Sequence, residues 1–537
     1  MAKSQELEEA ARLSKQVEQL YDQGEHDQAL PLAEQVLAIR QRLLGDEHTD
    51  TAEILNTLAV GYKTQKRYTE AEPLYIQALN IYQRRLGADH PETICSVNNL
   101  AALYKAQRHY KKAEPLYLRS LATNKRTLGA EHPDTANSLN SLAMLYYSQQ
   151  RYAEAESLHL QAIDIRTRLL GAEHPDTASS LNSLAMLYHS QGHHKKAEPL
   201  YLQALDIRKR VLGVDHPDTA NSLCNLAVVY RLEGNYKQAE FLYLQALDIN
   251  KRVSGADHLE TAATLNNLAV LYQVQGRYKK AEPLYLRALD IKKRVLGVDH
   301  PDTAFSLSNL ADIYKLQGRY TEAEHLYLQA IDINKRLLGV DHPGTASSLN
   351  NLAMLYDSQE CYKKAESLYL QALDIRKRQL GEDHPDTATS LCNLAVVYRL
   401  QGNYTKAKPL YLQSLDIRKR VLGEDHPDTA ISLNNLAVFY DWQERYTEAE
   451  PLYIQALAIR KRLFGKNHLD TVSSFNNLAD MYYSQARYEK AKPLYLQALQ
   501  GAEQCLGHDH PTTVAIRNNL DRLRNPNLIE TLQQWFN

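Results

Sequence analysis

The chain has 537 residues, and its 62 lysines and arginines nearly balance its 64 aspartates and glutamates, which leaves a formal net charge of −2 at pH 7. Because neither sign is in excess, the composition offers no dominant surface for nucleic acid or an anionic membrane. The apolar runs are too short to span a membrane, and the start MAKSQELEEAARL lacks the apolar core of a signal peptide, so we expect a cytoplasmic protein.

A glycine recurs every 42 residues along nearly the whole sequence, without one insertion. A typical copy reads LGVDHPDTANSLCNLAVVYRLEGNYKQAEFLYLQAL and spans residues 212–247. The recurring glycines are Gly45, Gly87, Gly129, Gly171, Gly213, Gly255, Gly297, Gly339, Gly381, Gly423, Gly465 and Gly507. A fixed period indicates units that pack only on their neighbours, so we expect one elongated array rather than several globular domains.

The array divides into three parts. Residues 1–44 form a divergent first copy, in which Gln16 replaces a leucine and predicts a polar N-terminal cap. Residues 45–507 hold eleven full copies, and residues 508–537 add one more first helix, through about Leu523, and a short tail. The terminal Trp535 and Phe536 are expected either to cover the last apolar face or to act as a docking tail.

Each copy predicts two amphipathic helices joined by a short turn at Gly234. One helical stripe contains Ala220, Leu223, Leu226, Ala227 and Tyr230, and a second contains Ala239, Leu242, Tyr243, Ala246, Leu247 and Val253. Neither stripe can be buried within one pair, so each pair needs its neighbour. The three tyrosines of a copy, Tyr230, Tyr236 and Tyr243, are interpreted as core and interface residues.

The recurring LG-x-x-HPDT marks the boundary between copies. Lys209 and Arg210 suit the last turn of a helix, and Gly213 suits a left-handed stop. Pro217 suits the first position of the next helix, and Asp218 places an anion near its N-terminus. Twelve histidines recur at the position of His216, most of them followed by proline, and they form a row of helix starts. Because neighbouring helices lie about 8–10 Å apart, this row cannot converge on one ion, and we expect no metal site.

The small residue Ala227 with Gly234, Tyr236, Ala239, Tyr243 and Ala246 resembles the tetratricopeptide repeat pattern, whose usual period is about 34 residues. The longer copy, with NNLA and HPDTA, resembles the repeats of kinesin light chains and related adaptors over roughly residues 45–523. The resemblance implies an all-α fold, a right-handed α-solenoid of about twelve helix hairpins with a C-terminal capping helix. Kinesin light chains carry a heptad coiled coil ahead of their repeats, and we find no heptad tract in this sequence.

No unique catalytic constellation stands out from the repeating background. The sequence contains no P-loop, no GxSxG and no HExxH, so we expect neither an enzyme nor a cofactor. The five cysteines, Cys95, Cys224, Cys361, Cys392 and Cys505, form no CxxC pair and are expected to be reduced.

The resemblance implies a concave channel lined by the first helix of each copy, and helical geometry turns residues 221, 224, 225, 228, 231 and 232 toward it. The position of Asn225 repeats as Asn99, Asn225, Asn267, Asn309, Asn351, Asn393, Asn435 and Asn477. A carboxamide donates and accepts hydrogen bonds, so this row could hold the backbone of a peptide, as the related adaptors do. The alternative is that these asparagines bond to the neighbouring helix and stiffen the array.

Less regular positions on the same side would supply specificity. Met186, Val228 and Val270 offer an apolar floor, and Arg231, Lys315 and Arg399 are basic. We therefore expect a non-catalytic scaffold that binds extended or helical segments of other proteins, without nucleic acid or membrane. The alternative hypothesis is a kinesin-light-chain-like cargo adaptor of a microtubule motor, and membership of a signalling complex is a further possibility.

Overall fold

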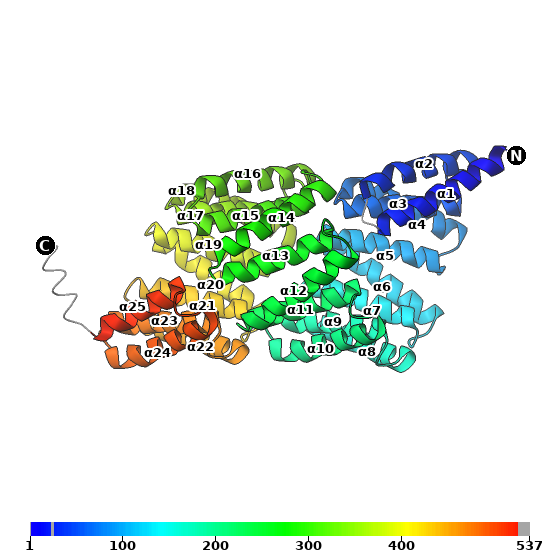
Figure 1. The fold of residues 1–537 in the computed structure, drawn as a ribbon. Coiled ribbons are helices and arrows are strands. Elements are labelled where there is room, and N and C mark those ends of the chain that lie inside the picture. Colours follow the sequence, from blue (N-terminus) through cyan, green and yellow to red (C-terminus); the bar gives the residue numbers. More distant parts are fainter. Residues whose placement is uncertain (1, 23–25, 525–537) are drawn as a thin grey trace.

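A computed structural model describes residues 2–22 and 26–524, which form 25 α-helices without a strand in those ranges (Figure 1). The helices are α1 (Ala2–Asp22), α2 (His26–Leu44), α3 (Thr49–Thr64), α4 (Tyr68–Arg85), α5 (Pro91–Ala106), α6 (Tyr110–Thr127), α7 (Pro133–Ser148), α8 (Tyr152–Leu170), α9 (Pro175–Ser190), α10 (His194–Val211), α11 (Pro217–Leu232), α12 (Tyr236–Val253), α13 (Leu259–Val274), α14 (Tyr278–Leu296), α15 (Pro301–Leu316), α16 (Tyr320–Leu337), α17 (Pro343–Ser358), α18 (Tyr362–Leu380), α19 (Pro385–Leu400), α20 (Tyr404–Leu422), α21 (Pro427–Asp441), α22 (Tyr446–Phe464), α23 (Leu469–Ser484), α24 (Tyr488–Leu506) and α25 (Pro511–Arg524). The predicted α-solenoid of helix hairpins is confirmed, whereas Trp535 and Phe536 lie outside the described residues. No helix within 2–22 or 26–524 has the length and apolar character needed to cross a membrane.

The histidine of each copy caps an odd-numbered helix. In α11, Nδ1 of His216 accepts a hydrogen bond from the backbone N–H of Asp218 at 3.1 Å, and Pro217 begins the helix. Thr219 Oγ1 then donates to the carbonyl of Gly213 at 2.8 Å, which ties the cap to the preceding glycine. The helix-start role predicted for this motif is therefore confirmed, and the imidazole itself supplies the capping acceptor.

The repeating glycine adopts a conformation that other residues do not reach. Gly171, the C-cap of α8, has φ 96° and ψ 159°, and Gly423 has φ 93° and ψ 166°. This is the region near ψ 160° that is essentially restricted to glycine, not the ordinary left-handed helical region predicted for the stop. The extended ψ carries the chain away from the helix end toward the next cap.

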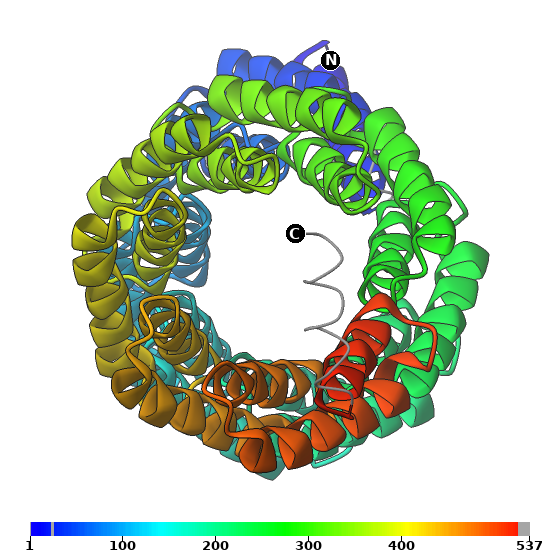
Figure 2. The same ribbon diagram turned by 90° about the vertical axis from the view of Figure 1, so that its left-hand side faces the viewer.

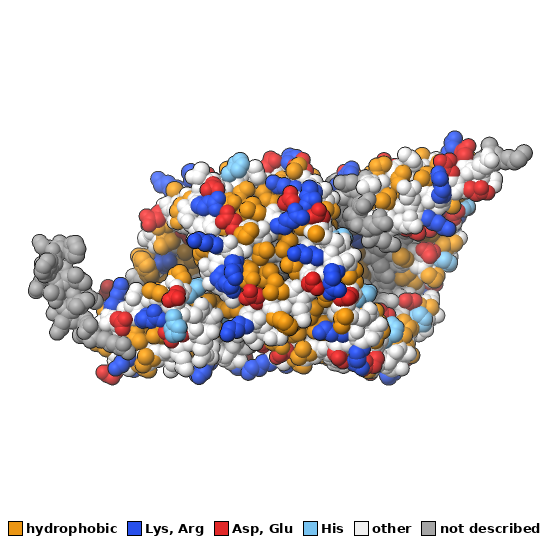
Figure 3. All heavy atoms as spheres, in the orientation of Figure 1, with side chains coloured by type: hydrophobic (Ala, Val, Ile, Leu, Met, Phe, Trp, Pro, Cys, Tyr) orange, Lys and Arg blue, Asp and Glu red, His pale blue; other side chains and the backbone are white. Residues whose placement is uncertain are grey.

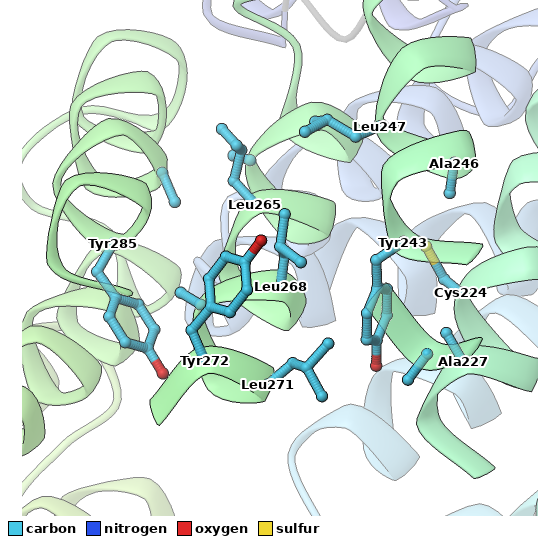
Figure 4. Packing of buried hydrophobic residues seen from close by; sticks show 14 of the residues in the cluster. Cys224, Ala227, Tyr243, Ala246, Leu247, Leu265, Leu268, Leu271, Tyr272 and Tyr285 are labelled. Carbon is cyan, nitrogen blue, oxygen red and sulfur yellow. The ribbon is translucent and has the colours of Figure 1, made fainter. Parts of the chain in front are cut away.

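The core lies between the two helices of each pair and between successive pairs. Ala227, Ala239, Tyr243 and Ala246 are each fully buried, so small side chains occur where backbones approach and tyrosine fills the space between them. Figure 4 shows Tyr243 beside Ala227 of α11 and facing Leu271 of α13. Each copy is thus completed by the next one, as the sequence predicts.

A buried arginine connects three helices at each of several copies. Arg208 of α10 donates to Ser222 Oγ of α11 at 2.7 Å and to Ser179 Oγ of α9 at 3.2 Å. Burial lowers the pKa of this guanidinium, which hydrogen-bonds to hydroxyl oxygens and the carbonyl of Asp218. The same arrangement recurs at Arg376 and Arg418, so these side chains fix the angle between neighbouring copies.

The hairpins wind into a right-handed superhelix around a central hollow (Figure 2). The closest contacts between helices two apart in the chain are all between odd-numbered helices, which therefore form the inner wall. Figure 2 agrees, since α25, in red, borders the hollow. The even-numbered helices form the outer wall, where basic and acidic side chains are interspersed on the face in Figure 3.

The end of one copy's first helix and the loop after it meet a helix start six copies later, as in the Lys66–Asp302 and Ser190–His426 contacts, so a second turn of the superhelix lies against the first. We call this contact line the seam. The loops that join odd to even helices form its first-turn side, which includes Lys66, Arg108, Gly192, Gly234 and Gly276. The helix starts that contain Asp302, Asp386, Pro427 and His510 form its second-turn side, together with Cys505. Arg108 Nη1 lies 3.1 Å from Asp386 Oδ2, and His426 Nε2 lies 3.3 Å from the carbonyl oxygen of Ser190.

The seam gives equivalent residues different surroundings in the two turns. The side chain of the capping His132 is 39% exposed, whereas that of His300 is 4% exposed because the first turn covers it. Tyr236 is 5% exposed, but the equivalent Tyr488, at the free edge of the second turn, is 44% exposed. The interpretation of every Tyr236 equivalent as a core residue therefore holds only where the second turn lies above it.

Candidate binding surface along the inner wall

The predicted asparagines lie half-buried on the odd-numbered helices of the inner wall. Asn225 donates from Nδ2 to Oδ1 of Asn182 in the preceding copy at 2.9 Å. The same bond joins Asn309 to Asn266 at 2.8 Å, Asn393 to Asn350 at 2.9 Å and Asn477 to Asn434 at 3.0 Å. We call these four hydrogen bonds between asparagine side chains the asparagine ladder. Each of them connects two neighbouring odd-numbered helices.

The ladder uses only part of each side chain. The Oδ1 atoms of Asn225, Asn309, Asn393 and Asn477 accept no hydrogen bond from residues 2–22 or 26–524. Their partners Asn266, Asn350 and Asn434 are buried, so the position equivalent to residue 224 lies between helices more than in the channel. Both roles considered for the row thus have a structural basis, because the amide groups link the copies and the oxygens stay available.

Four predicted asparagines lie outside the ladder. In the copies that precede Asn267 and Asn351, Cys224 and Ser308 stand where the ladder has an asparagine acceptor. Neither Asn267 nor Asn351 forms a side-chain hydrogen bond within the described ranges. Asn435 donates to Cys392 Sγ at 3.0 Å, and Asn99 donates to Cys95 Sγ at 3.9 Å. Among the eight predicted asparagines, the side chains of Asn267 and Asn351 are therefore the least constrained by hydrogen bonds to other described residues.

The predicted basic residues have distinct surroundings. Lys315 Nζ lies 3.2 Å from Asp312 Oδ1, which also accepts from the hydroxyl of Tyr327 at 2.5 Å. Arg231 lies beside Tyr243, whose pKa burial raises to about 12 although Arg231 opposes that shift. The Arg399 guanidinium lies 4.8 Å above the ring of Trp442, which is 61% exposed. Arg399 and Trp442 together form a cationic and aromatic surface.

Other charges on the inner wall form no ion pair with the described residues. Burial lowers the pKa of Lys63 and of Lys105, and the two lysines repel each other; no carboxylate within the described ranges forms an ion pair with either. Burial likewise raises the pKa of Asp357, with Arg399 opposing the shift. The inner wall of the first turn is therefore basic around Lys63 and Lys105. In the second turn, the acidic Asp357 lies near the basic Arg399.

Two hollows open beside these residues. One, of about 470 Å³, lies among α5, α6 and α7 and is lined by Asn98, Asn99 and Asn124 with Cys95. The other, of about 390 Å³, lies beneath the seam and is lined by Lys105, Tyr147, Tyr152 and Asp386. The second hollow is lined by residues of both superhelical turns, so the sequence of a single copy does not predict it. The available signal was a break in the repeat, since Lys66 and Arg108 occupy a position that is glycine in several other copies.

In the described part of the chain, no three histidine, cysteine, aspartate or glutamate side chains are placed to hold a metal ion. The five cysteines are unpaired, and burial raises the pKa of Cys224 to about 11. The described side chains of this wall offer hydrogen-bonding groups, apolar surface and charges.

Sequence comparison identifies the chain as a member of the tetratricopeptide repeat family. Twelve overlapping matches to this repeat begin at residue 8 and end at residue 522. The family predicted from the repeating pattern is confirmed, and its members typically form non-catalytic scaffolds for protein–protein interaction. No curated protein matches the sequence.

Similar solved structures include BtubC (BKLC) from P. vanneervenii, with 26% identity and a TM-score of 0.37 over 43% of this chain and 92% of that chain. The nearly identical TPR-like repeats of a putative kinesin light chain from Podosopora anserina match with 28% identity and a TM-score of 0.33, over 38% of this chain and 97% of that chain. A Rap protein complexed with competence and sporulation factor shares 14% identity, with a TM-score of 0.44 over 77% of this chain and 99% of that chain.

Proposed function

We propose that the protein is a non-catalytic scaffold that holds an extended or helical segment of a partner protein against the inner wall of its superhelix. The observation that carries the proposal is the asparagine ladder, in which the oxygens of Asn225, Asn309, Asn393 and Asn477 remain without a hydrogen bond from the described residues. Backbone N–H groups of a bound segment are suitable donors to such oxygens, and this recognition does not depend on the sequence of the segment.

Selectivity would come from the irregular positions along the same wall. Met354 is 40% exposed, Leu316 is 46% exposed and Trp442 is 61% exposed, so the wall offers apolar surface between the ladder and the loops. Lys63 and Lys105 are half-buried without an acidic partner in the described ranges, and an anionic group of a bound segment would stabilise them. The segment favoured by this wall has an apolar or aromatic anchor and acidic residues.

The experiment is a selection of 12-residue peptides from a displayed random library on the immobilised full chain, followed by affinity measurements with variants. The double variant Asn267→Ala/Asn351→Ala removes two carboxamides that form no side-chain hydrogen bond with residues 2–22 or 26–524. Since a hydrogen bond contributes about 0.5–1.5 kcal/mol, losing two should weaken a selected peptide by roughly 5-fold to 150-fold. The free energy of unfolding should not change.

The matched control replaces two exposed carboxamides of the outer wall, Gln203→Ala/Gln245→Ala, on α10 and α12. Peptide affinity should be unchanged in this control. Failure to select any peptide, or equal affinity of the wild type and the Asn267→Ala/Asn351→Ala variant, would contradict the proposed binding surface.

The cargo-adaptor hypothesis makes a separate prediction, namely that a kinesin heavy chain purifies together with the protein. Retention of heavy chain by the immobilised full chain would favour this narrower function. Peptide binding without heavy-chain binding would leave the general scaffold as the function.

A further inference from the structure

The seam contains the residues at which the repeat is broken. Lys66 and Arg108 have φ of 58° and 59°, in the left-handed region, at a position that is Gly192, Gly234 or Gly276 in later copies of the same turn. Gln150, Glu360, Glu444 and Ala486 have the same left-handed φ at the equivalent position, so this conformation belongs to the turn in general, and Lys66 and Arg108 are distinguished by their pairing across the seam. Here Lys66 pairs with Asp302 at 2.5 Å and Arg108 with Asp386 at 3.1 Å.

The free edge of the second turn has no such cations. The equivalent positions there are Gly318, Glu360, Gly402, Glu444 and Ala486. Since the opposite free edge presents the acidic helix starts of the first turn, two molecules that met end to end would bring carboxylates together. The cations therefore stand only where the chain meets its own second turn, which indicates that the seam is a specific contact within one molecule.

Histidines lie at the centre of the seam. His300, His342, His384, His426 and His468 each accept a backbone N–H at Nδ1 as helix caps, which requires that this nitrogen carry no proton. The other side of the ring faces the first turn. His426 stacks on Tyr152 with centroids 6.5 Å apart, and Phe464, 4.4 Å from His468, stacks on His194 at 5.5 Å. A Cβ atom added to Gly192 would lie 2.6 Å from Pro427, so the two turns are in direct contact.

We infer that the seam is a proton-sensitive clasp: it closes the superhelix at neutral pH, it parts on mild acidification, and its parting opens the hollow along the side. The parting does not depend on the proposed function. Only its consequence, lateral access of a partner segment to the inner wall, rests on that function.

The groups around the histidines make protonation unfavourable in the closed state. The charged and titratable groups facing them are Lys66, Lys292 and Asp302 at His300; Lys66, Arg108 and His109 at His342; Arg108, Arg376 and Asp386 at His384; His193, Arg418 and Asp428 at His426; and His194, Arg231, Arg460 and Asp470 at His468. The cations repel a protonated imidazole. The carboxylates oppose them, but Asp302 and Asp386 are already paired with Lys66 and Arg108.

The direction of the pH effect follows from these surroundings. Burial, with Arg108 and His109 adding to it, lowers the pKa of His342 from 6.5 to about 4, and burial also lowers the pKa of the other four histidines. The parted state, with ordinary histidines, binds more protons, so closure is fully stable above pH 6.5 and weakens as pH falls toward 4. The pKa values of Asp302 and Asp386 are lowered, so both stay ionised and the effect belongs to the histidines.

The first experiment measures the radius of gyration of the full chain by small-angle X-ray scattering at pH 7.5 and pH 5.0, with helix content followed by circular dichroism. The wild type should expand at pH 5.0 with unchanged helix content. The variant His300→Asn/His342→Asn/His384→Asn/His426→Asn/His468→Asn keeps an acceptor at each cap and has no proton to gain there, so its dimensions should be the same at both pH values. The matched control makes the same change at the solvent-facing caps His48, His90, His132, His174 and His216, and it should expand like the wild type.

A disulfide across the seam tests the clasp without altering a histidine. A Cβ atom on Gly234 would lie 3.0 Å from Cys505 Sγ, the separation that an S–S bond of about 2.05 Å implies. Gly234→Cys, with Cys95, Cys224, Cys361 and Cys392 replaced by serine, should oxidise at pH 7.5 and then keep its dimensions at pH 5.0 until a reductant is added. Gly318→Cys in the same background is the control, because nothing lies within 4 Å of that site, and it should form no intramolecular disulfide.

Expansion of the oxidised Gly234→Cys variant, expansion of the five-histidine seam variant equal to that of the wild type, or no expansion of the wild type would each overturn the clasp. None of these outcomes involves a partner peptide. A failed peptide selection would therefore count against the proposed function and leave the clasp standing.

Discussion

Nζ of Lys66 lies 2.5 Å from Oδ1 of Asp302, although 236 residues separate them in the sequence. Lys66 lies in the loop between α3 and α4, and Asp302 lies in the first turn of α15. The pair shows that copies six apart face each other across the seam. A solenoid is usually a chain of nearest-neighbour contacts, so this contact adds a constraint that the repeat alone does not provide.

The Lys66–Asp302 pair should contribute a small but measurable coupling energy. The two side chains are 29% and 45% exposed, and ion pairs with such exposure contribute about 0.2–1 kcal/mol at low salt. A double-mutant cycle with Lys66→Ala and Asp302→Ala, measured by urea unfolding, gives this value. A parallel double-mutant cycle on Arg378 and Asp374, an ion pair within one outer-wall helix, gives the coupling energy of an ordinary exposed pair for comparison. Zero coupling between Lys66 and Asp302 at low salt would contradict this predicted contribution.

His159 should make the protein less stable in acid. It is fully buried in α8 at a position that is tyrosine in the ten later and earlier full copies, and burial lowers its pKa to about 4. The folded state therefore holds it neutral, so its stabilising contribution is complete above pH 6.5 and is lost as pH falls toward 4. At pH 5 the loss is about 2 kcal/mol, at 1.36 kcal/mol for each pKa unit.

His159→Tyr should remove that loss. Unfolding free energies measured at pH 7.5 and 5.0 should differ less in the variant than in the wild type by about 2 kcal/mol. The exposed His174→Asn serves as the control and should leave the pH dependence unchanged. An identical pH dependence in His159→Tyr and the wild type would mean that this imidazole is not buried as described.

The small residues of the core should tolerate no enlargement. Ala227 is fully buried where α11 approaches its neighbours, so Ala227→Leu should destabilise the protein by about 1–3 kcal/mol or more. Ala263→Leu, on the exposed side of α13, is the matched control and should stay within about 0.5 kcal/mol of the wild type. Hydrogen exchange of α10–α13 would locate the loss, and equal effects of the two changes would contradict the assigned packing.

The features that repeat in every copy could be predicted from the sequence. The helix pairs, the His216 caps and the alanine contacts follow from local periodicity and end chemistry. The inner position of Asn225 is what the resemblance to tetratricopeptide repeats implies. The seam could not be predicted in this way. The rotation from one copy to the next is small and accumulates over many copies. Whether Lys66 meets Asp302 depends on that accumulated rotation. The sequence leaves open whether the asparagine row bonds to the neighbouring helix or faces a ligand, and geometry is needed to show that the amide of Asn225 donates to Asn182 while its oxygen accepts no hydrogen bond from the described residues.

The contact between the two superhelical turns is tested most directly by chemical cross-linking of Lys66 to Lys292. The Nζ of Lys66 contacts the Asp302 carboxylate, and the Nζ of Lys292 lies 3.5 Å from the carbonyl oxygen of Asp302. Burial lowers the pKa of Lys292, which increases the fraction of its reactive neutral form. A short amine-reactive reagent, applied to the full chain at pH 7.5, should join Lys66 to Lys292 within the monomer, and Lys66→Ala should abolish the link. A monomer in which lysines of adjacent copies are joined but Lys66 and Lys292 never are would contradict the two-turn superhelix.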